Sequence, residues 1–230
     1  MRLLLLLLAS LGTLLAQTPS EEISRLNPTD LQARAQRGDP EAQWRLASVL
    51  RSTNFPGYKQ DYGESLKWMR KAHAQGYLPA TMGVGDAYLQ GWAVPREPSS
   101  ALKYYREAAT KGFAPAQAML GRLFLTGVNV NPNKSEGMKW MNLAIVQRDV
   151  SAALNLAYFT ENGLHGLKKD KVQAVVYYAV AVEFGGRGSP ESKLAELRLE
   201  LTPEQKPEAI NRTKALLATV KPAKPVMQAR

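Results

Sequence analysis

Two stretches of this sequence, GYLPATMGVGDAYLQG at residues 76–91 and GFAPAQAMLGRLFLTG at residues 112–127, are near copies of one another, placed 36 residues apart. Each runs from a glycine through Pro-Ala to a second small residue, and ends on another glycine. Small residues at helical spacing let one helix approach its neighbour closely. A glycine at the end of such a run favours the left-handed conformation that stops a helix. The pattern therefore predicts one helix in each stretch.

The same pattern occurs four times along the chain. Its alanines are spaced by 38, 36 and 36 residues, at Ala42, Ala80, Ala116 and Ala152. A second block in each copy predicts a second helix, which carries an aromatic residue at Trp68, Tyr104, Trp140 and Tyr177. We expect this aromatic residue to fill the space beside the small residue of the first helix. A single hairpin cannot bury its apolar face, so the four hairpins must stack.

The rest of the chain divides around this array. Residues 1–16, MRLLLLLLASLGTLLA, have the basic, apolar and small-residue order of a signal peptide, although cleavage at Ala16 stays open. The four repeats occupy 31–186, at about 33–75, 76–111, 112–147 and 148–185. Residues 17–30 and 221–230 are expected to be disordered, and 187–220 to form two helices that cap the array with a polar end. The chain has no cysteine, so it forms no disulfide and carries no lipid on cysteine.

The repeat resembles the Sel1-like repeat, a relative of the tetratricopeptide repeat. The match rests on G-x-x-x-A-x-x-x-[LV]-[GA] with a glycine six residues on, then [DEN]-x-x-x-[AGS]-x-x-[WY]-x-x-x-A-x-x-x-G. The resemblance implies an all-α fold, a right-handed superhelical solenoid of hairpins. Its first helices line a concave groove that generally binds protein partners. Members are often exported bacterial adaptors, which agrees with a periplasmic or extracellular location here.

The tetratricopeptide analogy also implies which residues face the groove. They are Trp44, Arg51, Met82, Asp86, Arg122, Tyr158 and Glu161. Tryptophan, tyrosine and arginine are the residue types that dominate binding hot spots. For Trp44 and Tyr158 the alternative, packing against the preceding hairpin, stays open.

Positive charge recurs at the repeat period. The net charge is +10, and Lys67, Lys103 and Lys139 occupy equivalent positions of the second helices. Such a row predicts either affinity for an anionic envelope surface or an ordinary solvated face. Nucleic acid is not expected as a partner, because no aromatic residues alternate with these lysines.

The sequence offers little for catalysis. Ser100 and Lys103 fit the S-x-x-K pattern of serine β-lactamases and penicillin-binding proteins, but S-D-N and K-T-G do not occur. A surface position of the repeat explains this pair as well. His73 and His165 fall in different repeats, so we expect no metal site and no cofactor.

Two functions follow from these observations. The first is an exported, non-catalytic adaptor that binds a protein or peptide in its groove. The second is an envelope enzyme or a protein that binds anionic polymers of the cell wall, as the resemblance of one cysteine-rich branch to β-lactamases implies. The partner and the oligomeric state are left open by the sequence.

Overall fold

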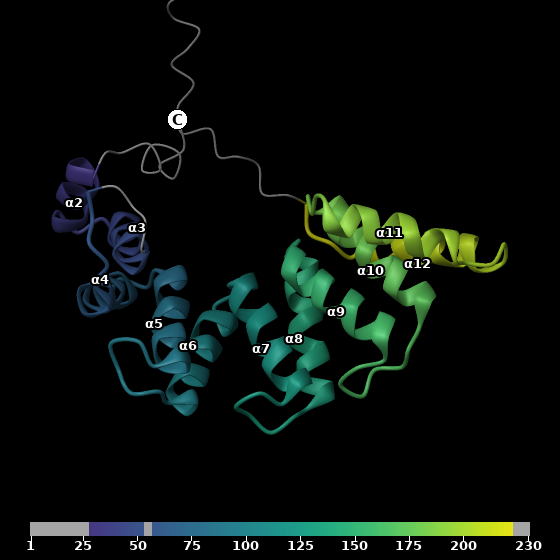
Figure 1. Cartoon of the computed structure of the whole chain (residues 1–230), viewed down its shortest axis with the longest axis horizontal. Helices are drawn as coiled ribbons and strands as arrows, with labels where there is room; N and C mark the ends of the chain where they lie inside the picture. The colour runs from purple at the N-terminus through teal and green to yellow at the C-terminus, as the bar shows by residue number, and fades with distance from the viewer. Residues whose placement is uncertain (1–27, 53–56, 223–230) are drawn as a thin grey trace, which may run out of the picture. The chain divides into compact units, whose positions relative to one another are not determined.

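The computed structural model describes residues 28–52 and 57–222, and within them the chain forms eleven α-helices and no strand (Figure 1). The all-helical expectation is confirmed. The predicted signal peptide and most of the two segments expected to be disordered lie outside the described residues. Among the described residues, no helix combines the length and the apolar character needed to cross a bilayer.

The described chain divides into two compact units, one ending at Tyr77 and one spanning Leu78–Pro222. The first unit holds three helices: α2 (Pro28–Gln36), α3 (Pro40–Arg51) and α4 (Tyr62–Ala74). The second unit holds eight. They are α5 (Leu78–Gln90), α6 (Pro98–Thr110), α7 (Ala114–Thr126), α8 (Lys134–Val146), α9 (Val150–Asn162), α10 (Lys171–Glu183), α11 (Ser189–Leu199) and α12 (Gln205–Ala218).

The four repeats are the hairpins α3–α4, α5–α6, α7–α8 and α9–α10, and in each the two helices pack closely on one another. We call the first helix of a hairpin its A helix and the second its B helix. The repeat alanines Ala42, Ala80, Ala116 and Ala152 are fully buried. Helix stops are left-handed as expected, with φ of +71° at Gly127 and +88° at Gly112. Arg148, which replaces the turn glycine, adopts the same conformation (φ 67°), and its guanidinium lies 4.9 Å from the centre of the Phe184 ring.

The residue that fills the space beside the small A-helix residue differs from the one expected. A Cβ built on Gly85 would lie 2.8 Å from Cε1 of Tyr105, and one on Gly121 would lie 2.6 Å from Cγ of Met141. Tyr105 and Met141 are fully buried, whereas Tyr104 and Trp140, the expected residues, are partly exposed. The expectation was wrong by one position, because the residue four after the small residue of the B helix points across the interface and the residue three after it lies on the flank.

Most of the expected caps form. Asp61, Asn133 and Asp170 each accept a hydrogen bond from the backbone N–H three residues on, so asparagine serves here as well as aspartate. Glu97 makes no such bond, and its carboxylate instead accepts the hydroxyl of Ser100 at 2.8 Å.

A glutamine relay links consecutive helices at two places. The Gln43 side chain donates to the carbonyl oxygen of Ala35 at the end of α2 (3.1 Å), and Gln75 donates to Gln43 (2.8 Å). In the second unit Gln117 donates to the carbonyl of Ala109 (3.0 Å) and Gln147 donates to Gln117 (2.7 Å). The same two carbonyl oxygens also accept the N–H groups of Gly38 and Gly112, so each glutamine adds a second hydrogen bond at a helix end.

Helix α2 occupies the place of a preceding B helix, because Ala35 receives the same bond as Ala109 of α6. It begins at Pro28, so the segment expected to be disordered, 17–30, overlaps it by three residues. At the other end, α11 and α12 form as expected, but Leu199 and Ile210 are 84% and 53% exposed. The end that was expected to be polar therefore also carries two exposed apolar side chains.

Candidate functional site

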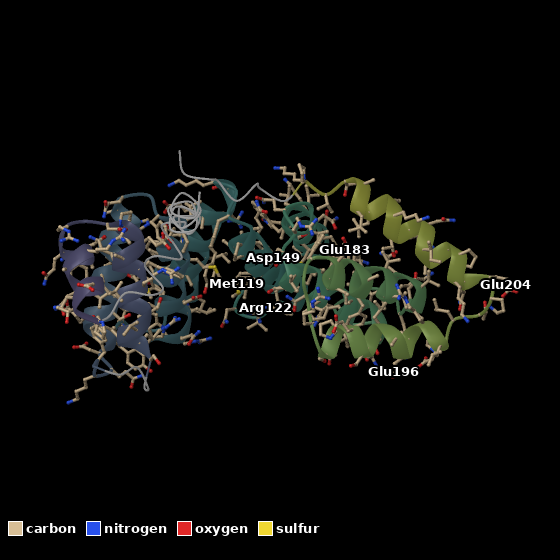
Figure 2. The ribbon with its side chains drawn as sticks, turned by 90° about the horizontal axis from the view of Figure 1, so that it is seen from above. Met119, Arg122, Asp149, Glu183, Glu196 and Glu204 are labelled. Atoms are coloured by element: carbon tan, nitrogen blue, oxygen red, sulfur yellow. The ribbon has the colours of Figure 1, made fainter. Side chains whose placement is uncertain are left out.

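Three A helices of the second unit surround a hollow of about 520 Å³, which we call the α7–α9 cavity. Its walls come from α5, from α7 and from the start of α9. The lining residues are Met82, Pro115, Ala118, Met119, Arg122, Asp149, Ser151, Leu154 and Asn155. Figure 2 labels Met119 and Arg122 on α7 with Asp149 beside them. The cavity thus combines flexible apolar side chains with one cation and one carboxylate.

The two charges of this cavity are held differently. The Arg122 guanidinium contacts the sulfur of Met119 at 3.0 Å. Asp149 caps α9, and its Oδ1 accepts the N–H of Ala152 at 2.8 Å. Burial raises the pKa of Asp149 above its usual value, although the N–H groups of Ala152 and Ser151 partly oppose this. A cationic group that entered the cavity would therefore relieve an unfavourably buried carboxylate.

A second hollow of about 520 Å³, the α9–α11 cavity, adjoins the first, because Leu154 lines both. Glu161 lines this cavity and is held by two partners: it accepts the Tyr178 hydroxyl at 3.0 Å and pairs with Lys193 at 2.9 Å. Burial and the bond to Glu161 raise the pKa of Tyr178 to about 12, so its hydroxyl stays protonated at neutral pH. The Tyr158 side chain lies at the edge of this cavity and is 54% exposed.

The structure brings together four of the seven residues predicted to bind a partner. Met82 and Arg122 line the α7–α9 cavity, and Tyr158 and Glu161 line the α9–α11 cavity. Asp86 lines neither cavity and accepts the Tyr105 hydroxyl at 2.7 Å.

The remaining two predicted residues, Trp44 and Arg51, lie on α3 of the first unit. The Trp44 ring lies 6.0 Å from the ring of Tyr77, which follows α4 of the same hairpin, so packing of Trp44 against a preceding hairpin stays a prediction. The Arg51 carbonyl accepts the side-chain amide of Gln60 at 2.9 Å.

Sequence reasoning missed several lining residues. Pro115 and Ser151 stand one residue before the repeat alanine, and Met119 and Asn155 stand three after it. The predicted groove residues stand two, six or nine residues after the alanine, and these missed positions lie on the same helix face, because a helix repeats every 3.6 residues. A helical projection of the A helices could have found them. Asp149 could have been found as the cap that precedes α9.

None of the three lysines of the predicted anionic-surface row lines these cavities. Lys67, Lys103 and Lys139 are exposed on α4, α6 and α8. Lys67 pairs with Glu64 at 3.0 Å, and that hydrogen bond raises the pKa of Lys67. Lys103 and Lys139 form no ion pair within the described part of the chain, so their charges are open to solvent.

The candidate catalytic residues do not converge. Ser100 donates its hydroxyl to Glu97, and Lys103 is exposed one turn further along α6. His165 packs edge-on against the Phe159 ring at 4.6 Å. Over residues 28–52 and 57–222, no group of three or more histidine, cysteine or acidic side chains is placed to hold a metal ion.

Asp149→Asn and Asp39→Asn are expected to change stability in opposite directions. The raised pKa of Asp149 means that its protonated form stabilises the fold at low pH, and this contribution is lost as the pH rises through that pKa. An asparagine side chain at this position keeps the cap without the buried charge. At pH 7 we expect Asp149→Asn to raise the melting temperature by about 2–4 °C, the shift that 1 kcal/mol gives in a chain of this size.

Asp39 supplies the matched control, because it also caps an A helix. Burial opposes its ionised form, but the N–H of Ala42 and the Arg34 guanidinium hold the pKa of Asp39 below its usual value. Asp39→Asn should therefore lower the melting temperature at pH 7. Thermal scans between pH 3 and 8 should show both differences shrinking as the pH falls below about 4, where an unfolded aspartate is protonated. Differences of the same sign would contradict the opposite pKa shifts.

Comparison with known proteins gives a consistent result. The model of the family described as Sel1 repeat matches residues 40–77, 78–113, 114–145 and 150–183, which is more than half of the chain. No match was found among curated proteins.

Solved structures with similar folds come from bacteria. A protective antigen of uropathogenic Escherichia coli strains, displaying an SLR fold, is 27% identical, with a TM-score of 0.63 over 83% of this chain. The match covers 41% of that antigen, so this chain spans about two fifths of its length. A Sel1 repeat protein from Oxalobacter formigenes is 22% identical, with a TM-score of 0.63 over 85% of this chain and 84% of its own. A putative Sel1 repeat protein from Klebsiella pneumoniae is 19% identical, with a TM-score of 0.55 over 83% of this chain and 92% of its own.

Proposed function

Because the chain belongs to the Sel1 repeat family, whose members typically mediate contacts between proteins, we propose that it is a non-catalytic adaptor that holds a segment of a protein partner along the α7–α9 and α9–α11 cavities. The observation that carries this proposal is the placement of Arg122 among Met82, Met119 and Leu154 in one hollow. Methionine side chains adapt to partners of different shape, and arginine anchors a carboxylate through two parallel hydrogen bonds.

The same residues define what the segment carries. Arg122 pairs with an aspartate or glutamate of the segment, and the apolar wall beside Arg122 packs against a neighbouring aliphatic or aromatic side chain. Asp149 accommodates a lysine or arginine further along the segment. In the adjoining cavity, Glu161 already has two partners, so Tyr158 is the residue there that offers free contact area.

The adaptor is further proposed to act outside the cytoplasm, in the periplasm or beyond the cell. This rests on residues 1–16, whose basic start and leucine-rich run are typical of an export signal.

The test uses the exported form of the protein, recovered from outside the cytoplasm, to capture the partner from envelope extract. N-terminal sequencing of the recovered chain would place the cleavage at Ala16 or contradict export. Arg122→Glu is expected to weaken binding of the captured protein by about 30-fold or more, the loss that 2 kcal/mol at a hot spot produces.

Two matched variants separate this proposal from its alternatives. Lys139→Glu makes the same change of charge on α8, outside both cavities, and should leave binding intact at moderate salt. If Lys139→Glu abolished binding and Arg122→Glu did not, the lysine row would be the working surface. If Ser100→Ala removed an activity on cell-wall material, the protein would be an enzyme and the adaptor proposal would be wrong.

A further inference from the structure

The C-terminal end of the second unit has a hollow of its own. Helices α10, α11 and α12 surround about 630 Å³, which we call the C-terminal groove. Its floor is apolar and buried, with Val175 of α10, Leu201 of the α11–α12 loop and Ala209 of α12 each at most 5% exposed. Leu199 and Ile210 stand at its edge with most of their surface in solvent. Large apolar side chains that surround an open hollow in this way mark an interaction surface.

Three cations line the same groove: Arg198 of α11 and Lys206 and Lys214 of α12. None of them forms an ion pair within residues 28–52 and 57–222, and no acidic side chain is among the lining residues. The nearby acids are engaged or turned away. Glu200 pairs with Lys171 at 2.6 Å, and Glu208 pairs with Arg212.

Figure 2 shows α11 and α12 diverging from the loop that carries Glu204. In the same view Glu196 lies on the side of α11 away from α12. It pairs with Lys193 at 3.0 Å, a residue of the α9–α11 cavity. The groove therefore offers positive charge without acidic neighbours on its walls.

We propose that the C-terminal groove binds an amphipathic α-helix of a protein partner, with the apolar face of that helix flanked by aspartate or glutamate. An apolar trough between two diverging helices fits the apolar stripe of a third helix, which inserts side chains at every third or fourth position. The unpaired cations complement acidic residues beside that stripe.

Charge also decides against a second copy of this chain. Two copies meeting through this groove would bring six cations together in proteins that each carry a net charge of +10. A flat anionic bilayer fits less well than a helix, because Val175, Leu201 and Ala209 lie at the bottom of a hollow and not on a protruding face. The inference is independent of the proposed function, since no residue lines both this groove and the A-helix cavities.

The experiment measures fluorescence anisotropy of a labelled synthetic helix of about 18 residues, or five turns. One probe has a leucine face flanked by glutamates, and a second has lysines in place of the glutamates. We expect the chain to bind the glutamate probe and not the lysine probe. Ile210→Ser and Lys214→Glu are each expected to weaken binding about tenfold, through lost apolar burial and reversed charge respectively. Only the effect of Lys214→Glu should shrink as salt rises.

Leu143→Ser and Lys168→Glu are the matched controls, because they make the same changes at exposed sites of the second unit outside the groove. They should bind like the unmodified chain. Failure to bind the glutamate probe, equal binding of both probes, or equal loss in the control variants would overturn the proposal. Two further results would overturn it if the glutamate probe does not bind. One is a dimer in sedimentation velocity that Ile210→Ser abolishes, and the other is capture by phosphatidylglycerol vesicles that Ile210→Ser abolishes. Those results would assign the groove to a second copy or to a membrane.

Discussion

Replacing Tyr105 with alanine is expected to cost about 3–5 kcal/mol of the free energy of unfolding, the loss typical of a large buried aromatic side chain. Tyr105 is fully buried, and its ring lies against Gly85, where an added Cβ would be 3.3 Å from the carbonyl oxygen of Ala101 on α6. Its hydroxyl donates to Asp86 at 2.7 Å, and burial together with this carboxylate raises its pKa far above the usual tyrosine value. Alanine would leave a cavity and would remove the hydroxyl that donates to Asp86. Urea denaturation followed by circular dichroism measures the loss.

Two companion variants separate the causes. Tyr105→Phe keeps the ring and removes only the hydrogen bond, so we expect a loss of about 1.5–3 kcal/mol, the range for bonds to charged groups. Tyr104→Ala removes an aromatic ring from the adjacent position, where it stacks on Tyr88 at 5.8 Å and stays partly exposed. Its cost should be the smallest of the three. A larger cost for Tyr104→Ala than for Tyr105→Ala would restore the assignment that the sequence pattern favoured.

Gly121→Ala is expected to destabilise the protein by about 2–3 kcal/mol, the upper part of the range for overpacking a core. Helices α7 and α8 touch through their backbones here. The added Cβ would lie 2.6 Å from Cγ of Met141 and 3.0 Å from both the carbonyl oxygen of Gly137 and the backbone nitrogen of Met141. The side chain of Met141 could move, but the two backbone atoms can retreat only if the helices separate.

Gly63→Ala is the control for the intrinsic effect of alanine in a helix. Gly63 lies in the first turn of α4, and the nearest atom to its added Cβ is a side-chain oxygen of Asp61 at 3.3 Å. We expect this variant to be neutral or more stable by up to about 1 kcal/mol, since alanine has the higher helix propensity. Equal urea midpoints for Gly121→Ala and the unmodified chain would show that the α7–α8 contact is looser than the structure indicates.

The hairpin array could be predicted because its cause is local in sequence. Small residues at a fixed spacing are needed wherever two helices touch, and glycine is favoured wherever the chain turns with positive φ. Trp68 and Tyr177 are buried as expected, but Tyr105 and Met141 and not their neighbours fill the closest contacts. For finding the residue at the closest helix contact, the aromatic character of a residue was less informative than its position around the helix axis, which we call its phase. Only the phase determines which side chains point across an interface.

The candidate site could be predicted in part for the same reason. Residues two, six and nine positions after the repeat alanine reach the cavities at Met82, Arg122, Tyr158 and Glu161. Asp86, at the same phase as Arg122, is instead held by the Tyr105 hydroxyl from the neighbouring helix. A single-helix projection contains no information about such a partner. The exposed apolar end at Leu199 and Ile210 was missed because the polar composition of α11 and α12 says little about how the few apolar residues are grouped.

The glutamine relay has a consequence for how this architecture can be cut and transplanted. In the sequence the period begins at the turn residue before each A helix, a glycine in three of the four repeats, which suggests a two-helix module. The hydrogen-bonded unit is offset by half a period: from Ala109 through Gln117 to Gln147 it spans α6, α7 and α8. A fragment excised at the glycines would separate Gln117 from the Ala109 carbonyl to which it donates. Chimeric arrays that keep the glutamine hydrogen bonds should therefore be joined at the start of a B helix. Each module then consists of a B helix, an A helix and the next B helix, and neighbouring modules have one B helix in common.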